Sequence, residues 1–325
     1  MNSRTFGRLG WEVSEIGFGA WALGGGWGPQ DDKDSLAALH AALDLGCNFI
    51  DTALAYGDGR SERVIAQALP DRVGQRIYIA TKIPPAPGPW PPTPHDRIED
   101  RYPAAYLRQK VEESLRNLRV ERLDLLQLHT WTRAWNRNPS ALATLRELQS
   151  EGKIEGIGLS TPEHDQNAFN DLMRGGWLDA VQIIYNIFEQ EPAAELLPLA
   201  REHGVGVIVR VVFDEGALTG KFNKDTAFDE DDFRRNYFAG DRLGRTVQRV
   251  EKIRATVADR EPDLATTALK FALKSPAVST VIAGMRNADQ AARNCAVSGQ
   301  PPMTDALESG LRQHSWLRGF WYGGK

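Results

Sequence analysis

Four residues with acid–base side chains stand at or just after the ends of short apolar stretches. Asp51 ends the stretch NFID, and Tyr56 follows it by five residues. Lys82 ends IYIATK, and His129 ends LLQLH. A tyrosine hydroxyl ordinarily titrates at about pH 10, but a neighbouring ammonium lowers that pKa and a carboxylate keeps the ammonium charged. A tyrosine tuned in this way can protonate a carbonyl oxygen while hydride arrives at the carbon, with His129 orienting the carbonyl or relaying the proton.

Each of these residues also has an ordinary structural interpretation. Asp51 would cap the turn after its strand, and Tyr56 would pack at a loop before Gly57. His129 would be a hydrogen-bonded core histidine. Lys82 is harder to explain in this way, because a buried lysine needs a partner. Four such residues at neighbouring strand ends favour a shared site over four separate structural roles.

The elements that must position these residues alternate between short β-branched runs and longer helical periods. Most of the runs are too apolar to have one wet face, which is typical of parallel strands covered by helices. The predicted strands are 15–19, 48–51, 77–82, 123–129, 154–160, 180–184, 205–211 and 278–283. The predicted helices are 35–45, 61–69, 104–118, 140–149, 163–174, 193–203 and 264–273.

Turn residues support this alternation. Gly46, Gly152 and Gly204 each end a predicted helix just before a strand, where glycine takes a left-handed conformation without a Cβ penalty. Thr161, Pro162 and Glu163 read as the N-cap and first turn of a helix. Eight strands with intervening helices predict an α/β fold, a (β/α)8 TIM barrel, rather than an open doubly wound sheet. We predict one domain over residues 1–325.

Three segments fall outside the alternation. Residues 5–14 predict a small N-terminal hairpin that seals the barrel floor. Residues 83–103 form a proline-rich loop after the third strand, and its prolines and aromatic residues favour an ordered lid. Residues 212–245 form an irregular stretch after the seventh strand. Both long loops follow the carboxyl ends of strands, where barrels of this kind build their active sites.

Composition excludes several other classes of protein. The chain of 325 residues has 39 basic and 43 acidic residues and a net charge of −4, with the two signs interspersed, which argues against nucleic acid binding. Cys47 and Cys295 are the only cysteines, too few for a disulfide framework, and both are predicted to be buried thiols. The N-terminus lacks the apolar core of a signal peptide, and no apolar stretch is long enough for a membrane span. We therefore predict a cytoplasmic, soluble protein with no membrane partner.

Several stretches together resemble the aldo-keto reductase superfamily, in the family's order and over nearly the whole chain. They are DTALAYG (51–57), TK (81–82), DLLQLH (124–129), GIGLS (156–160), Gln182, GALTGK (216–221) and residues 284–294. The resemblance implies a (β/α)8 barrel that reduces small aldehydes or ketones with a nicotinamide cofactor and no metal. It also implies that Tyr56 is the general acid, assisted by Lys82 and Asp51, with His129 completing a tetrad.

The resemblance also implies where the nicotinamide lies. Ser160 and Gln182 match residues that hydrogen-bond its carboxamide. Thr161 stands where the family usually has Asn, so one of those bonds would be shorter or lost. Arg210 stands where many relatives place a tyrosine under the nicotinamide ring. We expect Arg210 either to favour the reduced cofactor by stacking or to reach the pyrophosphate.

The rest of the cofactor is expected on two further segments. Residues 213–221 resemble the loop over the pyrophosphate, with the implied contacts Phe213, Gly216, Leu218, Gly220 and Lys221. The last βα unit matches the adenosine-phosphate end, with the implied contacts Gly284, Arg286, Gln290 and Asn294. Arg286 suits a ribose 2′-phosphate, because a planar guanidinium can bind it bidentately. Arg293 replaces an acidic or amide residue and either costs an adenine hydrogen bond or adds a phosphate contact. We therefore favour NADP(H) over NAD(H).

The substrate pocket is less well specified, because barrel-mouth loops vary within a fold. The candidates for an aromatic wall are Trp21, Trp90 and Trp131, with Trp316, Phe320 and Trp321 near the C-terminus. Some of these residues would instead be packing or surface residues. A homo-oligomer is compatible with the sequence.

Two other enzyme classes match parts of the sequence. Residues 17–22 match the G-x-G-x-x-A pattern of a dinucleotide-binding Rossmann fold, which requires a helix that opens inside the motif. The sequence continues as LGGGWGPQDD, which no helix would tolerate. A barrel enzyme that forms a Schiff base on Lys82 needs a neutral lysine, whereas an Asp and a Tyr are expected beside this one.

A third alternative is a regulatory protein rather than an enzyme. The potassium-channel β subunits of the same superfamily bind the cofactor with little turnover, and they keep the tetrad. The intact tetrad therefore does not exclude this alternative, although no partner surface is evident in the sequence.

Overall fold

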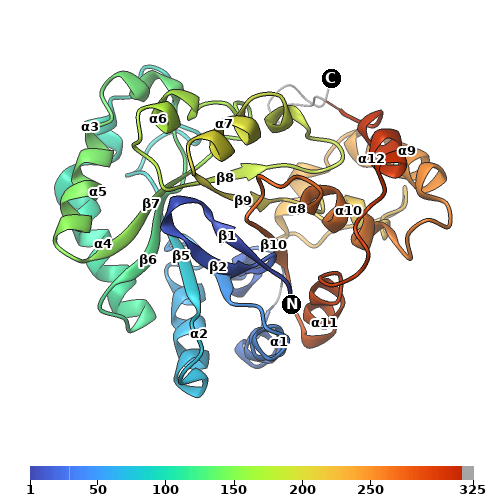
Figure 1. The fold of residues 1–325 in the computed structure, drawn as a ribbon, viewed down its shortest axis with the longest axis horizontal. Helices are drawn as coiled ribbons and strands as arrows, with labels where there is room; N and C mark the ends of the chain where they lie inside the picture. Colours follow the sequence, from blue (N-terminus) through green and yellow to red (C-terminus); the bar gives the residue numbers. More distant parts are fainter. Residues whose placement is uncertain (29, 317–325) are drawn as a thin grey trace.

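Parallel strands close into a barrel in the computed structural model, which describes residues 1–28 and 30–316 (Figure 1). The strand order is β10-β3-β4-β5-β6-β7-β8-β9, with every neighbouring pair parallel. The barrel strands are β3 Ile16–Gly19, β4 Phe49–Asp51, β5 Tyr78–Ile83, β6 Leu123–Leu128, β7 Ile154–Ser160, β8 Ala180–Ile184, β9 Gly206–Arg210 and β10 Thr280–Gly284. The predicted (β/α)8 fold is confirmed, and each predicted strand overlaps an observed one.

Helices surround the barrel and cover its outer face (Figure 1). They are α1 Asp32–Asp44, α2 Arg60–Ala68, α3 Ile98–Arg101, α4 Ala104–Leu118, α5 Ser140–Ser150, α6 Asn170–Arg174, α7 Leu196–Glu202, α8 Phe233–Tyr237, α9 Arg242–Val257, α10 Leu264–Leu273, α11 Ala288–Cys295 and α12 Asp305–Arg312. Helices α4 and α10 have the predicted bounds. The three predicted helix-ending glycines are also confirmed, with φ of +86° at Gly46, +76° at Gly152 and +60° at Gly204.

The helix predicted over 163–174 is wrong in its first half, because α6 begins only at Asn170. The side chain of Gln166 replaces the missing turns. Its Oε1 accepts hydrogen bonds from the Thr161 hydroxyl (2.8 Å) and the Ile184 backbone (2.9 Å), and its Nε2 donates to the Pro162 carbonyl (3.1 Å). Thr161 is therefore not a helix N-cap, since its hydroxyl is used by Gln166.

The stretch predicted as irregular, 212–245, is partly helical. It contains α8 and the first turn of α9. The helices predicted from the sequence did not include α9, α11 or α12. The buried positions of α9 do follow a helical period, at Thr246, Val250, Ile253 and Val257. Four arginines between and before them kept the mean hydropathy of the segment low and hid the pattern.

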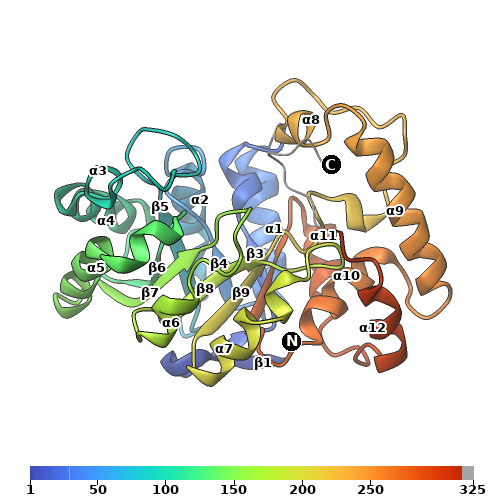
Figure 2. The same ribbon diagram turned by 90° about the horizontal axis from the view of Figure 1, so that it is seen from above.

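The predicted N-terminal hairpin is confirmed as β1 Ser3–Phe6 and β2 Trp11–Ser14. Its aromatic side chains close the floor of the barrel. Phe6 stacks on Phe49 with ring centroids 5.5 Å apart, and Trp11 stacks on Tyr78 at 4.8 Å. Figure 2 shows the hairpin at the lower edge of the barrel and α8 at the upper edge.

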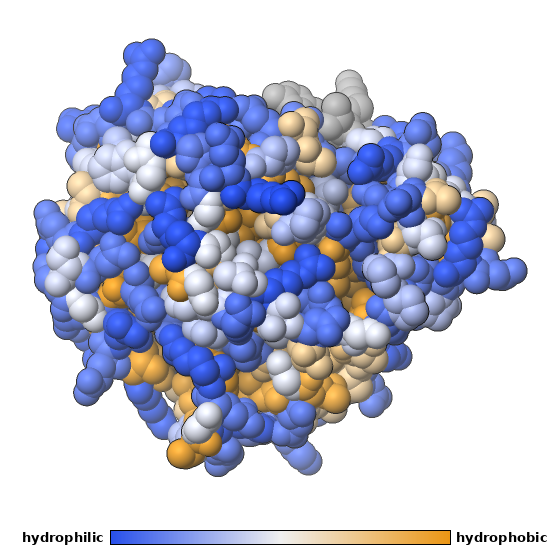
Figure 3. Space-filling view, in the orientation of Figure 1, coloured by the Kyte–Doolittle hydropathy of each residue, from blue (hydrophilic) through white to orange (hydrophobic). Residues whose placement is uncertain are grey.

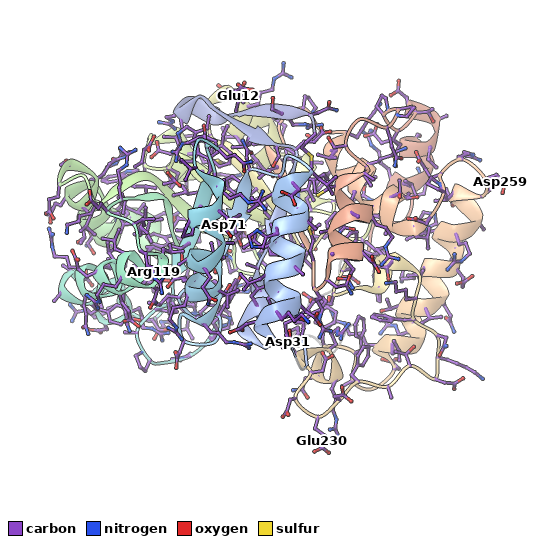
Figure 4. The ribbon with its side chains drawn as sticks, turned by 90° about the horizontal axis from the view of Figure 1, so that it is seen from below. Glu12, Asp31, Asp71, Arg119, Glu230 and Asp259 are labelled. Carbon is purple, nitrogen blue, oxygen red and sulfur yellow. The ribbon has the colours of Figure 1, made fainter. Side chains whose placement is uncertain are left out.

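The surface of the molecule also distinguishes the end with the hairpin from the end with α8. Glu12 of the hairpin and Glu230, just before α8, project from opposite ends of the molecule (Figure 4). The face that carries the hairpin is mostly hydrophilic, with hydrophobic residues in scattered groups (Figure 3). Cys47 and Cys295 are buried, as predicted. Among the described residues, no helix combines the length and the apolar character needed to cross a membrane.

A substitution at Gly206 tests the floor. A Cβ at this position would come within 2.5 Å of the Phe6 ring, so Gly206→Ala should lower the free energy of unfolding by about 1–3 kcal/mol through overpacking. Gly244→Ala in α9 is the matched control, because a Cβ there meets nothing within 4 Å and should stabilise the helix by up to about 1 kcal/mol. Urea unfolding measures both, and equal effects of the two variants would contradict the role of the Phe6 contact.

Candidate active site

A cavity of about 970 Å³ opens at the carboxyl ends of the barrel strands. Residues from all parts of the chain line it, including Asp51, Tyr56, His129, Gln182 and Arg286. This is the end at which (β/α)8 barrels carry their active sites. The floor hairpin packs against the other end of the barrel.

Lys82 brings the predicted catalytic group together beneath this cavity. Its Nζ donates hydrogen bonds to Asp51 Oδ1 (2.5 Å), to the Thr52 carbonyl (2.8 Å) and to the Tyr56 hydroxyl (3.3 Å). The lysine side chain is fully buried and that of Asp51 is only 3% exposed. Residues that lie 26 and 31 positions apart along the chain are thus in direct contact.

The pKa of Tyr56 corrects one expectation. Burial raises this pKa above its ordinary value, and the opposing pull of the Lys82 ammonium does not overcome it. The sequence predicted a net lowering, because it showed the lysine but not the degree of desolvation. Burial alone would lower the pKa of Lys82, but Asp51 and Tyr56 raise it overall, so the amine is charged. At neutral pH the site therefore holds a protonated phenol beside a cation.

His129 completes the group at the strand end of β6. Its ring lies edge-on to Tyr56, with centroids 5.6 Å apart, and to Trp90, at 5.4 Å. Burial, together with the charges of Lys82 and Arg210, holds the pKa of His129 well below its ordinary value. The imidazole is therefore neutral, and its Nδ1 has no hydrogen-bond partner among the described residues.

The second oxygen of Asp51 is held by two amides. Gln182 Nε2 donates to Asp51 Oδ2 at 2.6 Å, and Gln127 Nε2 donates to the same atom at 3.2 Å. Sequence reasoning placed Gln182 at the nicotinamide and did not single out Gln127. The available signal was the position of Gln127 two residues before His129, on the inward face of its strand.

The residues expected at the nicotinamide lie side by side at the mouth. Ser160, Thr161, Gln182 and Arg210 all line the cavity. A guanidinium nitrogen of Arg210 donates to the Thr161 carbonyl at 3.0 Å, while its Nε is buried without a partner among the described residues. Arg210 acts electrostatically on both Tyr56 and His129. Arg210 therefore lies within electrostatic range of the catalytic group, and its two expected positions toward the cofactor stay predictions.

The segment expected at the pyrophosphate is divided. Phe213, Gly216 and Lys221 line the cavity. Leu218 and Gly220 are not among its lining residues, and their assignment as cofactor contacts stays a prediction. Leu218 is only 1% exposed and packs in the core, and the Gly220 carbonyl accepts a hydrogen bond from Arg254 at 3.1 Å. Both residues are therefore held by contacts within the protein.

The residues expected at the adenosine end all line the cavity, and Arg293 joins them. Arg286 Nε donates to Gln30 Oε1 at 3.0 Å, and the Arg286 backbone N–H donates to Gln290 Oε1 at 2.9 Å. Asn294 Nδ2 donates to the Gly284 carbonyl at 3.3 Å.

The aromatic wall differs from its prediction. Trp21 and Trp90 line the cavity, but Trp131 does not. Trp131 is fully buried, donates from Nε1 to Asn136 Oδ1 at 2.8 Å and packs edge-on against Trp135.

The aromatic residues near the C-terminus do not complete this wall. Trp316 packs on Phe188 and does not line the cavity. Phe320 and Trp321 lie outside the described residues.

Two aromatic residues that the sequence did not single out complete the cover. Trp27 and Phe233 line the cavity, with rings 5.6 Å and 5.5 Å from Trp21. Trp27 also forms a backbone bridge with Asp232. The segment after β3 and the segment before α8 therefore meet over the cavity, although they are about 200 residues apart. Nothing in the local sequence indicates this long-range contact.

This cavity suits a dinucleotide. Its lining includes the cationic side chains of Lys221, Arg286 and Arg293 as well as the phenol of Tyr56 and the imidazole of His129. A Cβ added at Gly284 would meet nothing within 4 Å, so the strand end leaves open space. The donors and charges present are those that phosphates and an amide require.

Fold and site together define an oxidoreductase barrel that acts on small carbonyl compounds with a nicotinamide cofactor. The family model for the Aldo/keto reductase family matches residues 15–307, so the chain belongs to this family. It is 34% identical over 238 residues to the aldo-keto reductase YhdN of Bacillus subtilis (strain 168), covering 72% of this chain and 69% of that relative. It is 28% identical over 301 residues to the NADH-specific methylglyoxal reductase of Escherichia coli (strain K12), covering 87% and 89%. Among solved structures, the glycerol dehydrogenase AKR11B4 from Gluconobacter oxydans is similar, with a TM-score of 0.79, 28% identity and coverage of 96% and 94%.

A buried carboxyl was also missed. Glu215 lines the cavity, is only 9% exposed and has a left-handed backbone, with φ of +54°. Burial raises its pKa to about 7, and the charge of Glu163 acts in the same direction, against the pull of Arg210, Arg234 and Arg242.

The raised pKa of Glu215 predicts that this residue lowers the free energy of unfolding by an amount that depends on pH. Between its ordinary value of 4.5 and about 7 the folded protein holds more protons than the unfolded chain, so stability falls as pH rises through this window. Glu215→Gln should therefore gain up to about 3 kcal/mol relative to wild type between about pH 5 and pH 8. Urea unfolding at both pH values measures this gain, with the exposed Glu202→Gln as control. A gain equal at both pH values would contradict the assignment.

Proposed function

We propose that this protein is an NADP(H)-dependent aldo-keto reductase that reduces aldehydes or ketones to alcohols, with Tyr56 as the general acid. The observation that carries the proposal is the 3.3 Å contact between the hydroxyl of Tyr56, which lines the cavity, and the Lys82 ammonium beneath it. Membership of the family supports the reaction class.

Each side chain of the catalytic group has a separate role in the proposed reaction. When bound, the nicotinamide supplies the hydride. Tyr56 holds its proton at neutral pH, because its pKa is raised by burial, and gives that proton to the carbonyl oxygen. The Lys82 ammonium stabilises the phenolate that remains, and Asp51 keeps the amine charged. Neutral His129 does not compete as an acid and orients the carbonyl by hydrogen bonding.

The cofactor residues are proposed on the same basis. Ser160 and Gln182 would hold the carboxamide, and residues 213–221 would follow the pyrophosphate. Arg286 and Arg293 both line the cavity, and a guanidinium can bind a 2′-phosphate bidentately, which supports NADP(H). Family membership alone does not decide this point, since one similar relative is an NADH-specific enzyme.

Removal of the proposed acid tests the reaction. Tyr56→Phe should lower kcat by about 10²–10⁴-fold and leave cofactor affinity nearly unchanged, because the ring and its packing remain. Steady-state reduction of a panel of aldehydes by NADPH measures kcat, and fluorescence titration with NADPH measures cofactor affinity. Full activity in Tyr56→Phe would refute the role, and a wild type that binds NADPH tightly without turnover would favour a regulatory function.

A second prediction concerns Lys82. Lys82→Met removes the charge that stabilises the phenolate, so kcat should fall by a similar factor and its pH profile should move to higher pH. A variant with the wild-type profile would show that Lys82 does not tune Tyr56.

The cofactor prediction concerns the two arginines. Arg286→Ala should raise the Kd for NADPH about tenfold or more and leave the Kd for NADH nearly unchanged, because only the 2′-phosphate is lost as a partner. Arg293→Ala should have a smaller effect of the same kind. Equal effects on both cofactors would assign these arginines to the pyrophosphate or to structure.

A further inference from the structure

A layer of polar side chains crosses the barrel interior between the cavity and the floor. Asp51, Lys82, Gln127 and Gln182 are each at most 2% exposed. Below them the interior is apolar, with Phe49, Tyr78, Ala80, Leu125, Ala180 and Ile208 in one cluster. Polar groups in such surroundings are costly unless they are hydrogen-bonded, so each bond within the layer fixes a position.

Asp51 is the centre of this layer. One carboxylate oxygen receives the Lys82 ammonium, and the other receives the amide N–H groups of Gln182 (2.6 Å) and Gln127 (3.2 Å). Both oxygens of this carboxylate therefore accept hydrogen bonds from buried donors. The orientation of the carboxylate therefore depends on two amides as well as on the lysine.

The two amides differ in what else they can reach. Gln182 lines the cavity, where a cofactor amide would compete for it, whereas Gln127 does not line the cavity. The Oε1 of Gln127 has no partner among the described residues, so its side chain is positioned through Asp51. The neighbouring strand makes room for it, because a Cβ at Gly158 would come within 2.9 Å of Gln127 Cγ.

We infer that Gln127 is a positioning residue for the reduction. It holds the Asp51 carboxylate against Lys82 independently of the cofactor, and thereby sets how strongly Lys82 stabilises the Tyr56 phenolate. The inference rests on the proposed function, in which Tyr56 is the acid.

The direction of the effect follows from charge. The N–H of Gln127 places the positive end of a dipole beside the anionic side of the site. Its removal disfavours every nearby anion, both directly and by weakening the hold of Asp51 on the charged lysine. The ionisation of Tyr56 should therefore move to higher pH when Gln127 loses its N–H.

The experiment compares Gln127→Met with Thr280→Val. The first keeps the length of the side chain and removes the donor. The second is a matched control, because Thr280 is fully buried in the same barrel and its hydroxyl has no hydrogen-bond partner among the described residues. Gln127→Asn is a second test variant, since it keeps an amide that is one methylene too short for Asp51.

We expect the midpoint of the pH profile of kcat/KM to rise by about half to one unit in both Gln127 variants. 4-Nitrobenzaldehyde with NADPH and 4-nitrobenzyl alcohol with NADP⁺ serve as probes. Below the midpoint both directions should lose about three- to tenfold, and the Kd for NADPH should stay within about twofold of wild type. Thr280→Val should leave the midpoint in place.

A loss of activity that is equal at every pH, or a midpoint that moves equally in Thr280→Val, would overturn the inference. A tyrosinate absorbance titration of the cofactor-free protein, taken as the difference from the same background carrying Tyr56→Phe, reads the ionisation of Tyr56 without turnover. A raised spectroscopic midpoint supports the role of Gln127 even if activity fails to follow it, and that mismatch would count against Tyr56 as the acid. An unchanged spectroscopic midpoint overturns the role of Gln127 alone.

Discussion

The buried contact between Lys82 and Asp51 is the constraint on which the rest of the site depends. An ammonium removed from water is tolerated only when a carboxylate and further hydrogen bonds compensate it, and here the Asp51 oxygen, the Thr52 carbonyl and the Tyr56 hydroxyl surround it. The partners come from adjacent strands, so the closed barrel fixes their separation. A tyrosine beside this pair faces a cation on one side and the cavity on the other, which sets both its proton affinity and its reach.

Much of the barrel follows from local sequence. Apolar runs bounded by turn residues predicted every strand, and glycines such as Gly46 mark helix ends because the left-handed conformation is required there. The helix over 163–174 failed for a reason that no local pattern contains: Gln166 donates to the Pro162 and Glu163 carbonyls, which the first turn of a helix would otherwise bond. Helix α9 was missed because its four arginines lower the mean hydropathy of the segment and hide the period of its buried positions.

The site was partly predictable in the same way. Residues with acid–base chemistry at strand ends were found, because a parallel barrel brings strand ends to one edge. Aromatic residues were harder to assign, since nothing in the sequence around Trp131 or Trp27 indicates that only Trp27 lines the cavity. Desolvation is likewise a property of the packed structure, so the raised pKa of Tyr56 could not be predicted from the sequence. The expectation of one domain over the whole chain and the roles of the site residues stay predictions.

The aromatic floor has a consequence for the supply of protons. Phe6, Trp11, Phe49 and Tyr78 pack together below the polar layer and separate Lys82 from solvent on that side. In the proposed reaction Tyr56 must recover a proton after every turnover. That proton has to arrive through the mouth, along the route by which the alcohol departs, so recharging of the acid and release of product share one passage.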